Sequence, residues 1–100
     1  EAFLINDAAT RRRLMVESFR DMGLSCFEPL GAFYVFPGIQ KTGLSSEDFC
    51  QRLLREKKVV TVPGTAFGAS GEGYIRCSYA TGIAKLTEAL DRMADFVASL

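Results

Sequence analysis

The stretch Gly73-Tyr74-Ile75-Arg76-Cys77-Ser78-Tyr79-Ala80 decides how the rest of this chain is interpreted. All of its residues except Arg76 suit a short, half-buried β-strand. The arginine has apolar or small neighbours and no adjacent acidic residue. A planar, permanently charged guanidinium is poorly suited to simple packing within a strand. It is well suited to binding a carboxylate or phosphate through two parallel hydrogen bonds.

Two interpretations of Arg76 are open at the level of spacing. Because side chains alternate along a strand, Arg76 shares one face with Tyr74 and Ser78. Ile75 and Cys77 point to the other face. The first interpretation is that Arg76 belongs to a solvated face, and the second is that it binds an anionic ligand. Alternation supports the two about equally.

A glycine-rich segment, residues 63–73, leads into the strand. Its glycines do not form a G-x-G-x-x-G fingerprint, no Gly-Lys-Ser/Thr ending is present, and a strand rather than a helix follows. The segment therefore argues against nucleotide binding. It is either a connection that uses glycine for positive φ angles or a functional loop carried by a rigid scaffold, and we favour the loop.

The composition is that of one folded domain. The chain has 100 residues, of which 48% are hydrophobic and 24% charged. Twelve basic residues balance 12 acidic ones, which gives no electrostatic case for binding nucleic acid or an anionic membrane. No apolar run approaches the roughly 20 residues of a membrane span. The chain begins at Glu1 and enters a helical pattern almost at once, which predicts a piece of a longer protein.

Candidate catalytic groups are few. The chain has no histidine, and its lysines occupy predicted loops and solvent-facing helical positions. Three cysteines without a C-x-x-C pair indicate reduced thiols and a cytoplasmic location rather than a zinc site. We therefore expect no catalytic residue and no metal site in this chain.

Hydrophobic periodicity and turn signals predict seven elements in the order α-β-β-α-β-β-α. Ser45 with Asp48 has the spacing of a capping box, and Thr81 is the expected cap of the last helix. The run Arg11 to Arg13 is expected to be mostly solvated, with a contact to a missing domain as the alternative. The fold class is α+β, a small, mostly antiparallel or mixed sheet of about four strands with helices packed on one side. The predicted elements are residues 8–22, 25–28, 32–36, 45–58, 59–62, 74–79 and 83–100.

Three blocks of sequence resemble one family in order and spacing. They are Pro29-Leu30-Gly31-Ala32-Phe33-Tyr34-Val35-Phe36-Pro37, Val60-Thr61-Val62-Pro63-Gly64 with Phe67-Gly68, and Gly71-Glu72 followed by the opening stretch. They resemble the C-terminal part of the class I/II aminotransferases, pyridoxal-phosphate enzymes of the aspartate aminotransferase fold type. The resemblance covers nearly the whole chain and implies that residues 1–100 are the small domain of such an enzyme.

The resemblance also implies roles for particular residues. The position matching Arg76 binds the α-carboxylate of the amino-acid substrate, and Phe33, Tyr34 and Phe67 are weaker candidates for the rim of that site. Pyridoxal 5'-phosphate is bound mainly by the large domain, which also carries the Schiff-base lysine. The isolated chain is therefore expected to be inactive. The implied partners are amino-acid and 2-oxo-acid substrates, the enzyme's own large domain and, for the full-length enzyme, a second copy in a homodimer.

Other functions remain open at this stage. The chain is compatible with a free-standing regulatory module that binds an amino acid without catalysis, and with related lyases and synthases that share the fold. A pure interaction domain is favoured if Arg76 pairs internally with Glu72 or another acid. A small domain separated from its large domain should expose an apolar patch where the two packed.

Overall fold

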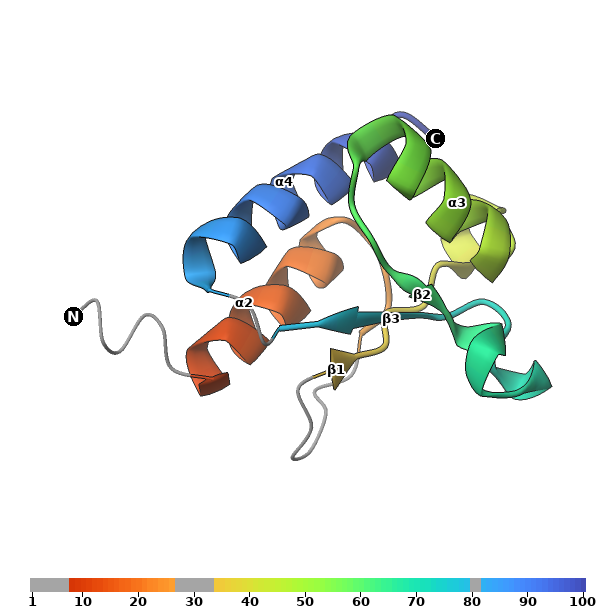
Figure 1. Cartoon of the computed structure of the whole chain (residues 1–100), viewed down its shortest axis with the longest axis horizontal. Helices are drawn as coiled ribbons and strands as arrows, with labels where there is room; N and C mark the ends of the chain where they lie inside the picture. The colour runs from red at the N-terminus through yellow and green to blue at the C-terminus, as the bar shows by residue number, and fades with distance from the viewer. Residues whose placement is uncertain (1–7, 27–33, 80–81) are drawn as a thin grey trace.

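The computed structural model describes residues 8–26, 34–79 and 82–100 (Figure 1). Within these ranges it contains three α-helices and three β-strands, an α+β fold that confirms the predicted class. In chain order they are α2 (Ala8–Asp21), β1 (Tyr34–Val35), α3 (Ser46–Lys57), β2 (Val62–Pro63), β3 (Ile75–Ser78) and α4 (Ile83–Ala98).

The arginine-bearing strand lies at the centre of the sheet. The strand order is β1-β3-β2, and both pairings are antiparallel. Val35 is opposite Cys77, and Val62 is opposite Arg76. Single bridges from Gly38 to Ser25 and to Tyr74 extend the pairing beyond the strands. A central strand is fixed by hydrogen bonds on both edges, so the position of Arg76 is determined by two neighbours.

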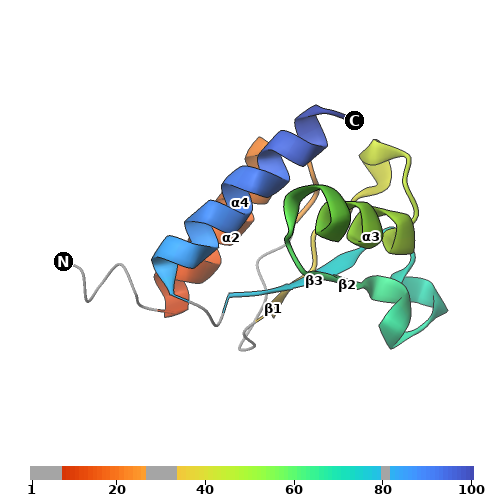
Figure 2. The same cartoon turned by 45° about the horizontal axis from the view of Figure 1, so that its top comes forward.

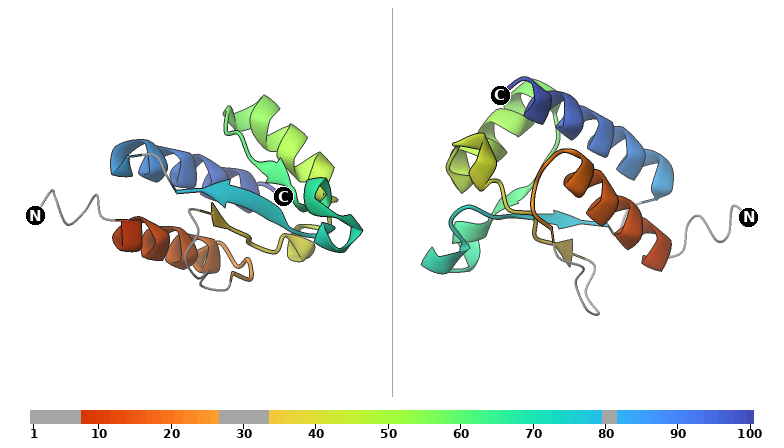
Figure 3. Two further views of the ribbon diagram at one scale, coloured as in Figure 1. Left: turned by 60° about the horizontal axis from the view of Figure 1, so that its bottom comes forward. Right: turned by 180° about the vertical axis from the view of Figure 1, so that it is seen from behind.

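The three helices lie on one side of the sheet (Figures 1 and 3). In Figure 2 α4 lies in front of α2, with which it is in contact, and α3 packs against both α4 and β2. Ile75 and Cys77 point into the core between sheet and helices and are buried. The rings of Phe49 and Phe96 meet edge to face there, with centroids 5.2 Å apart. Alternation along β3 therefore separates a buried apolar face from the face that carries Arg76.

Local capping signals explain where α3 begins. Ser45 precedes the helix, and its hydroxyl accepts a hydrogen bond from the backbone N–H of Asp48 at 3.1 Å. This confirms the predicted cap. At the other end Lys58 adopts the left-handed conformation and its N–H bonds to the carbonyl of Leu54. The predicted cap of α4, Thr81, lies outside the described residues, and Gly82 occupies the N-cap position.

The strand predicted over residues 59–62 is wrong in its extent. Pairing with β3 begins at Val62, and the preceding residues leave the sheet. Val59 is buried, whereas Val60 is 77% exposed, and a cavity of about 60 Å³ opens between this segment, Ser78 and α4. A run of β-branched residues is typical of a strand, but it pairs only where a neighbour lies alongside.

The other strand predictions have mixed outcomes. The strand predicted over residues 32–36 is present as Tyr34–Val35, and its first two positions lie outside the described residues. Of the strand predicted over 25–28, Ser25 forms a single bridge, and residues 27 and 28 are likewise outside the described ranges. The described sheet thus has three strands, roughly in agreement with the expected four or so, and part of one predicted strand lies outside the described ranges.

The arginines at the start of α2 differ in their exposure to solvent. Arg13 is exposed, as expected. Arg11 is half-buried, and its Nε donates to the carbonyl of Tyr79 at 2.9 Å. Consecutive helical residues point in different directions, so one of them can bond to the end of β3 while another faces water. Among the described helices, none combines the length and the apolar character needed to cross a membrane.

Replacing Ser45 by alanine tests the cap of α3. The substitution removes the acceptor for the Asp48 N–H, and we expect it to lower the free energy of unfolding by about 1 kcal/mol. Urea denaturation of the chain measures this value. Ser70→Ala, on an exposed turn, is the matched control and should change stability by less than about 0.5 kcal/mol. Equal effects of the two substitutions would show that the cap does not contribute.

The buried thiols should make the fold sensitive to high pH. Burial raises the pKa of Cys77 well above its ordinary value of 9.0, with smaller contributions from the nearby Cys50 and Cys26. The folded thiol therefore keeps its proton while the unfolded one loses it, so stability is highest below pH 9.0 and falls above it. Urea midpoints of the reduced protein between about pH 8 and about pH 10 measure the fall. Cys77→Ala should make the pH dependence shallower, and an unchanged dependence would contradict this account.

Candidate functional site

Arg76 projects from the face of β3 opposite the core. Its neighbours Ile75 and Cys77 are buried, while Arg76 itself is half-buried. Because the helices occupy the core side of the sheet, the guanidinium lies on the side that they leave uncovered. Because Arg76 is half-buried, other side chains must cover part of its guanidinium.

Two aromatic rings cover the guanidinium. Its Cζ atom lies 4.2 Å from the ring centroid of Tyr34 and 4.5 Å from that of Phe67. Tyr34 belongs to β1, whereas Phe67 ends the short 3-10 turn that follows β2. The rings therefore approach from the two flanks of the central strand. Each such cation–π contact contributes roughly 0.5–2 kcal/mol, and contacts to the faces of a guanidinium leave its N–H edge available to a planar anion.

A third ring extends this surface. Phe36 meets Phe67 edge to face, with ring centroids 6.3 Å apart. We call Tyr34, Phe36 and Phe67 the aromatic surface; their exposed fractions are 37%, 46% and 54%. Large exposed aromatic side chains grouped around one charge are typical of an interaction or ligand site. An exposed apolar patch was expected of a small domain separated from its large domain, and these three rings are exposed together.

No acid neutralises Arg76 within the described part of the chain, where neither an ion pair nor a hydrogen bond of its side chain is found. The carboxylate of Glu72 instead accepts a hydrogen bond from the backbone N–H of Ser46 at 3.0 Å. The internal pair of Arg76 with Glu72, which would have favoured a pure interaction domain, is thus absent. A charge that is half-buried and not neutralised is well placed to bind an anion.

The sequence-predicted residues are brought together in part. Tyr34 and Phe67 contact Arg76, whereas Phe33 lies outside the described residues. Phe36 was not among the predicted residues. Its signal was available, because it stands two positions after Tyr34 and such residues share a face of an extended chain.

The described residues add no candidate to the sequence analysis for a catalytic or metal-binding group. Lys41, Lys58 and Lys85 are exposed, and Cys77 is a buried thiol whose raised pKa keeps it protonated. No group of three or more acidic, cysteine or histidine side chains in the described ranges could hold a metal. A pyridoxal phosphate site needs an amine in apolar surroundings to form a Schiff base. The described lysines do not fit that requirement, so we assign no cofactor-binding residue here.

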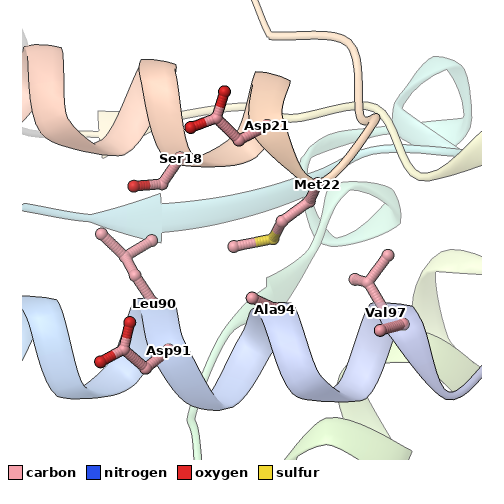
Figure 4. Close-up of a pocket in the computed structure, with 8 residues that line it drawn as sticks. Ser18, Asp21, Met22, Leu90, Asp91, Ala94 and Val97 are labelled. Carbon is pink, nitrogen blue, oxygen red and sulfur yellow. The ribbon is translucent and has the colours of Figure 1, made fainter.

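A separate groove lies in the helical layer, away from Arg76. It has a volume of about 420 Å³ and runs between α2 and α4, where Met22, Leu90 and Val97 line it (Figure 4). Asp21 and Asp91 contribute carboxylates from opposite helices. The groove contains none of the residues that surround the arginine.

Comparisons with known proteins point to one family. The model of the family described as aminotransferase class I and II matches residues 5–93. A Bacillus subtilis protein named as aminotransferase YugH is 60% identical over 87 residues, which is 87% of this chain and 22% of that protein. The chain therefore spans roughly a fifth to a quarter of the length of the curated relatives that it matches.

Solved structures agree with the sequence comparison. The aromatic aminotransferase from Pyrococcus horikoshii OT3 superposes with a TM-score of 0.90 at 46% identity, over 93% of this chain and 25% of that one. A pyridoxal-phosphate-bound protein from Clostridium difficile 630, described as an aminotransferase, superposes with a TM-score of 0.83 at 25% identity. That match covers 90% of this chain and 24% of the other.

Proposed function

The chain belongs to the class I and II aminotransferase family, and on that premise we propose that it is the small, C-terminal domain of a pyridoxal-phosphate-dependent aminotransferase. In this proposal Arg76 binds the α-carboxylate of the amino-acid substrate and of the 2-oxo-acid product. Tyr34 and Phe67 form the walls beside it, together with Phe33, the residue that precedes Tyr34 in the sequence.

The proposal rests on one observation: the guanidinium of Arg76 stacks on two aromatic rings and has no acidic partner among the described residues. It is held against two rings, within about 4.5 Å of each, and none of the described acids pairs with it. Its planar N–H edge matches a carboxylate, which accepts two parallel hydrogen bonds. Each charge-assisted bond contributes roughly 1.5–3 kcal/mol. The exposed N–H edge is thus suited to a planar anion such as a carboxylate.

Binding at Arg76 would orient the substrate. A carboxylate fixed at two points leaves the Cα substituents little rotational freedom, and such orientation supplies part of the rate enhancement. The aromatic surface would exclude water from the ion pair as the rest of the enzyme closes over it, which strengthens the charge interaction. The side chains of this chain therefore bind, orient and shield, and they transfer no proton.

The remaining parts come from outside the chain. Pyridoxal phosphate supplies the chemistry of amino-group transfer when it is bound, and the lysine and phosphate ligands that hold it would belong to a large domain. The aromatic surface is the face on which we place that domain. The full-length enzyme would be a cytoplasmic homodimer assembled through its large domain, and the isolated chain would be inactive.

Arg76→Lys in the full-length enzyme tests the proposed role. Lysine keeps the positive charge but cannot form the bidentate pair, so we expect kcat/KM to fall about 100-fold or more. Steady-state kinetics with an amino-acid substrate measures the change. Arg55→Lys, on the exposed surface of α3, is the matched control and should leave kcat/KM unaltered. Wild-type kinetics in Arg76→Lys would remove the assignment.

The aromatic contact makes a smaller, separate prediction. Phe67→Leu keeps an apolar side chain but removes the ring beside Arg76, and KM for the amino acid should rise roughly two- to tenfold. Phe36→Leu removes a ring that contacts Phe67 rather than the guanidinium, so its effect should be smaller. If the two variants raise KM equally, the cation–π contact is not what supports Arg76.

A further inference from the structure

The glycine-rich segment that carries Phe67 is a compact loop closed at its base. The N–H of Gly64 donates to the carbonyl of Tyr74 at 2.7 Å, and the N–H of Tyr74 donates to that of Gly71 at 3.1 Å. Gly64 and Gly71 approach so closely that a Cβ on either would overlap the backbone of the other. Figure 1 shows the loop projecting past the ends of β2 and β3. Glycine is required at these two positions because the loop doubles back on itself.

Two side chains fasten this loop to the start of α3. The carboxylate of Glu72 accepts from the N–H of Ser46 at 3.0 Å, and the Ser46 hydroxyl accepts from the N–H of Gly73 at 2.8 Å. The same hydroxyl lies 3.5 Å from the carbonyl of Gly71, to which it donates. Ser46 is fully buried. The contacts join residues more than 20 positions apart in the sequence.

The anchor point is suited to a carboxylate. The first N–H groups of a helix have no partner within the helix, and the helix dipole is positive there. Ser45 satisfies the N–H of Asp48, and Glu72 satisfies that of Ser46. Since α3 packs against both α4 and β2, its first turn is a fixed point of the fold. Through these bonds the loop is fixed to the rigid part of the domain.

Phe67 is carried by the loop that this anchor holds at its base. The loop residues from Ala66 to Ser70 are exposed, and the ring of Phe67 packs on Phe36 at the edge of the sheet. Phe67 nevertheless lies 4.5 Å from Arg76. The loop's position is therefore set by its closed base and by its attachment to α3.

We propose that Ser46 and Glu72 are positioning residues for carboxylate binding: they fix the loop so that Phe67 stays against Arg76. The inference rests on the proposed function, since it concerns the same arginine. Neither residue touches the substrate. Loosening the loop would let Phe67 leave the guanidinium, and the arginine would then lose one of the walls that hold it in its binding orientation.

Glu72→Ala in the full-length enzyme tests the anchor. We expect KM for the amino acid, and the inhibition constant of a competitive carboxylate, to rise together by roughly three- to tenfold. The value of kcat at saturation should stay within about twofold, because the substrate, once bound, is held by the same groups. Glu72→Gln keeps the acceptor oxygen without the charge and should restore part of the affinity.

Glu47→Ala is the matched control. Glu47 is an exposed acid in the same first turn of α3, so its removal changes the charge near the helix start while leaving the loop anchored. Its KM should equal that of the wild type. Ser46→Ala leaves the buried N–H of Gly73 without its acceptor, so it should raise KM and also lower Tm. Because Ser46→Ala changes both affinity and stability, Glu72→Ala is the decisive variant.

The outcomes separate this inference from the proposed function. Suppose that Arg76→Lys lowers kcat/KM but Glu72→Ala, like Glu47→Ala, leaves KM unchanged. The positioning role of Glu72 is then overturned, and the role of Arg76 in carboxylate binding is retained. If Arg76→Lys has no effect, the proposed function fails, and the anchor role fails with it. Glu72→Ala can also be assayed with an amine substrate that has no carboxylate. If KM rises equally for this substrate, the anchor role is overturned, because the lost affinity would not come from the contact between a carboxylate and Arg76.

Discussion

The contact between one guanidinium and two aromatic rings is the interaction on which this account depends. Arg76 lies 4.2 Å from Tyr34 and 4.5 Å from Phe67, and the described acids leave its charge unneutralised. Such an arrangement is costly unless an anion completes it, because a half-buried charge retains only part of its hydration. The rings offset some of this cost without occupying the N–H edge. The proposed binding of a carboxylate would complete this arrangement.

The fold explains how the charge is held. Arg76 stands on the central strand of an antiparallel sheet, so its backbone is fixed on both sides, and the core residues Ile75 and Cys77 secure the opposite face. One ring comes from β1 and the other from the loop after β2. The rings therefore converge only when both flanking strands are paired and the loop is anchored at α3. Folding and loop attachment are in this way coupled through a few hydrogen bonds, and under the proposed function carboxylate binding would depend on both.

Local features of this fold were predictable from the sequence, and the contacts between distant segments were not. The cap at Ser45, the amphipathic α4 and the strand around Arg76 follow from patterns within a few residues. The strand predicted over residues 59–62 was too long, because β-branched residues indicate a strand but not where its pairing begins. The bond from Glu72 to Ser46 spans 26 positions, and no spacing rule joins them. The sequence already pointed to Arg76, Tyr34 and Phe67, whereas Phe36 and the stacking of the rings on the guanidinium required coordinates.

The most direct test of the central claim changes the ligand and the arginine together. Binding of an amino acid and of its neutral α-amide to the full-length enzyme would be measured for the wild type and for Arg76→Ala. The account predicts that the wild type prefers the carboxylate by at least about tenfold and that the preference disappears in the variant. A preference that survives in Arg76→Ala would show that another group binds the carboxylate and would contradict the account.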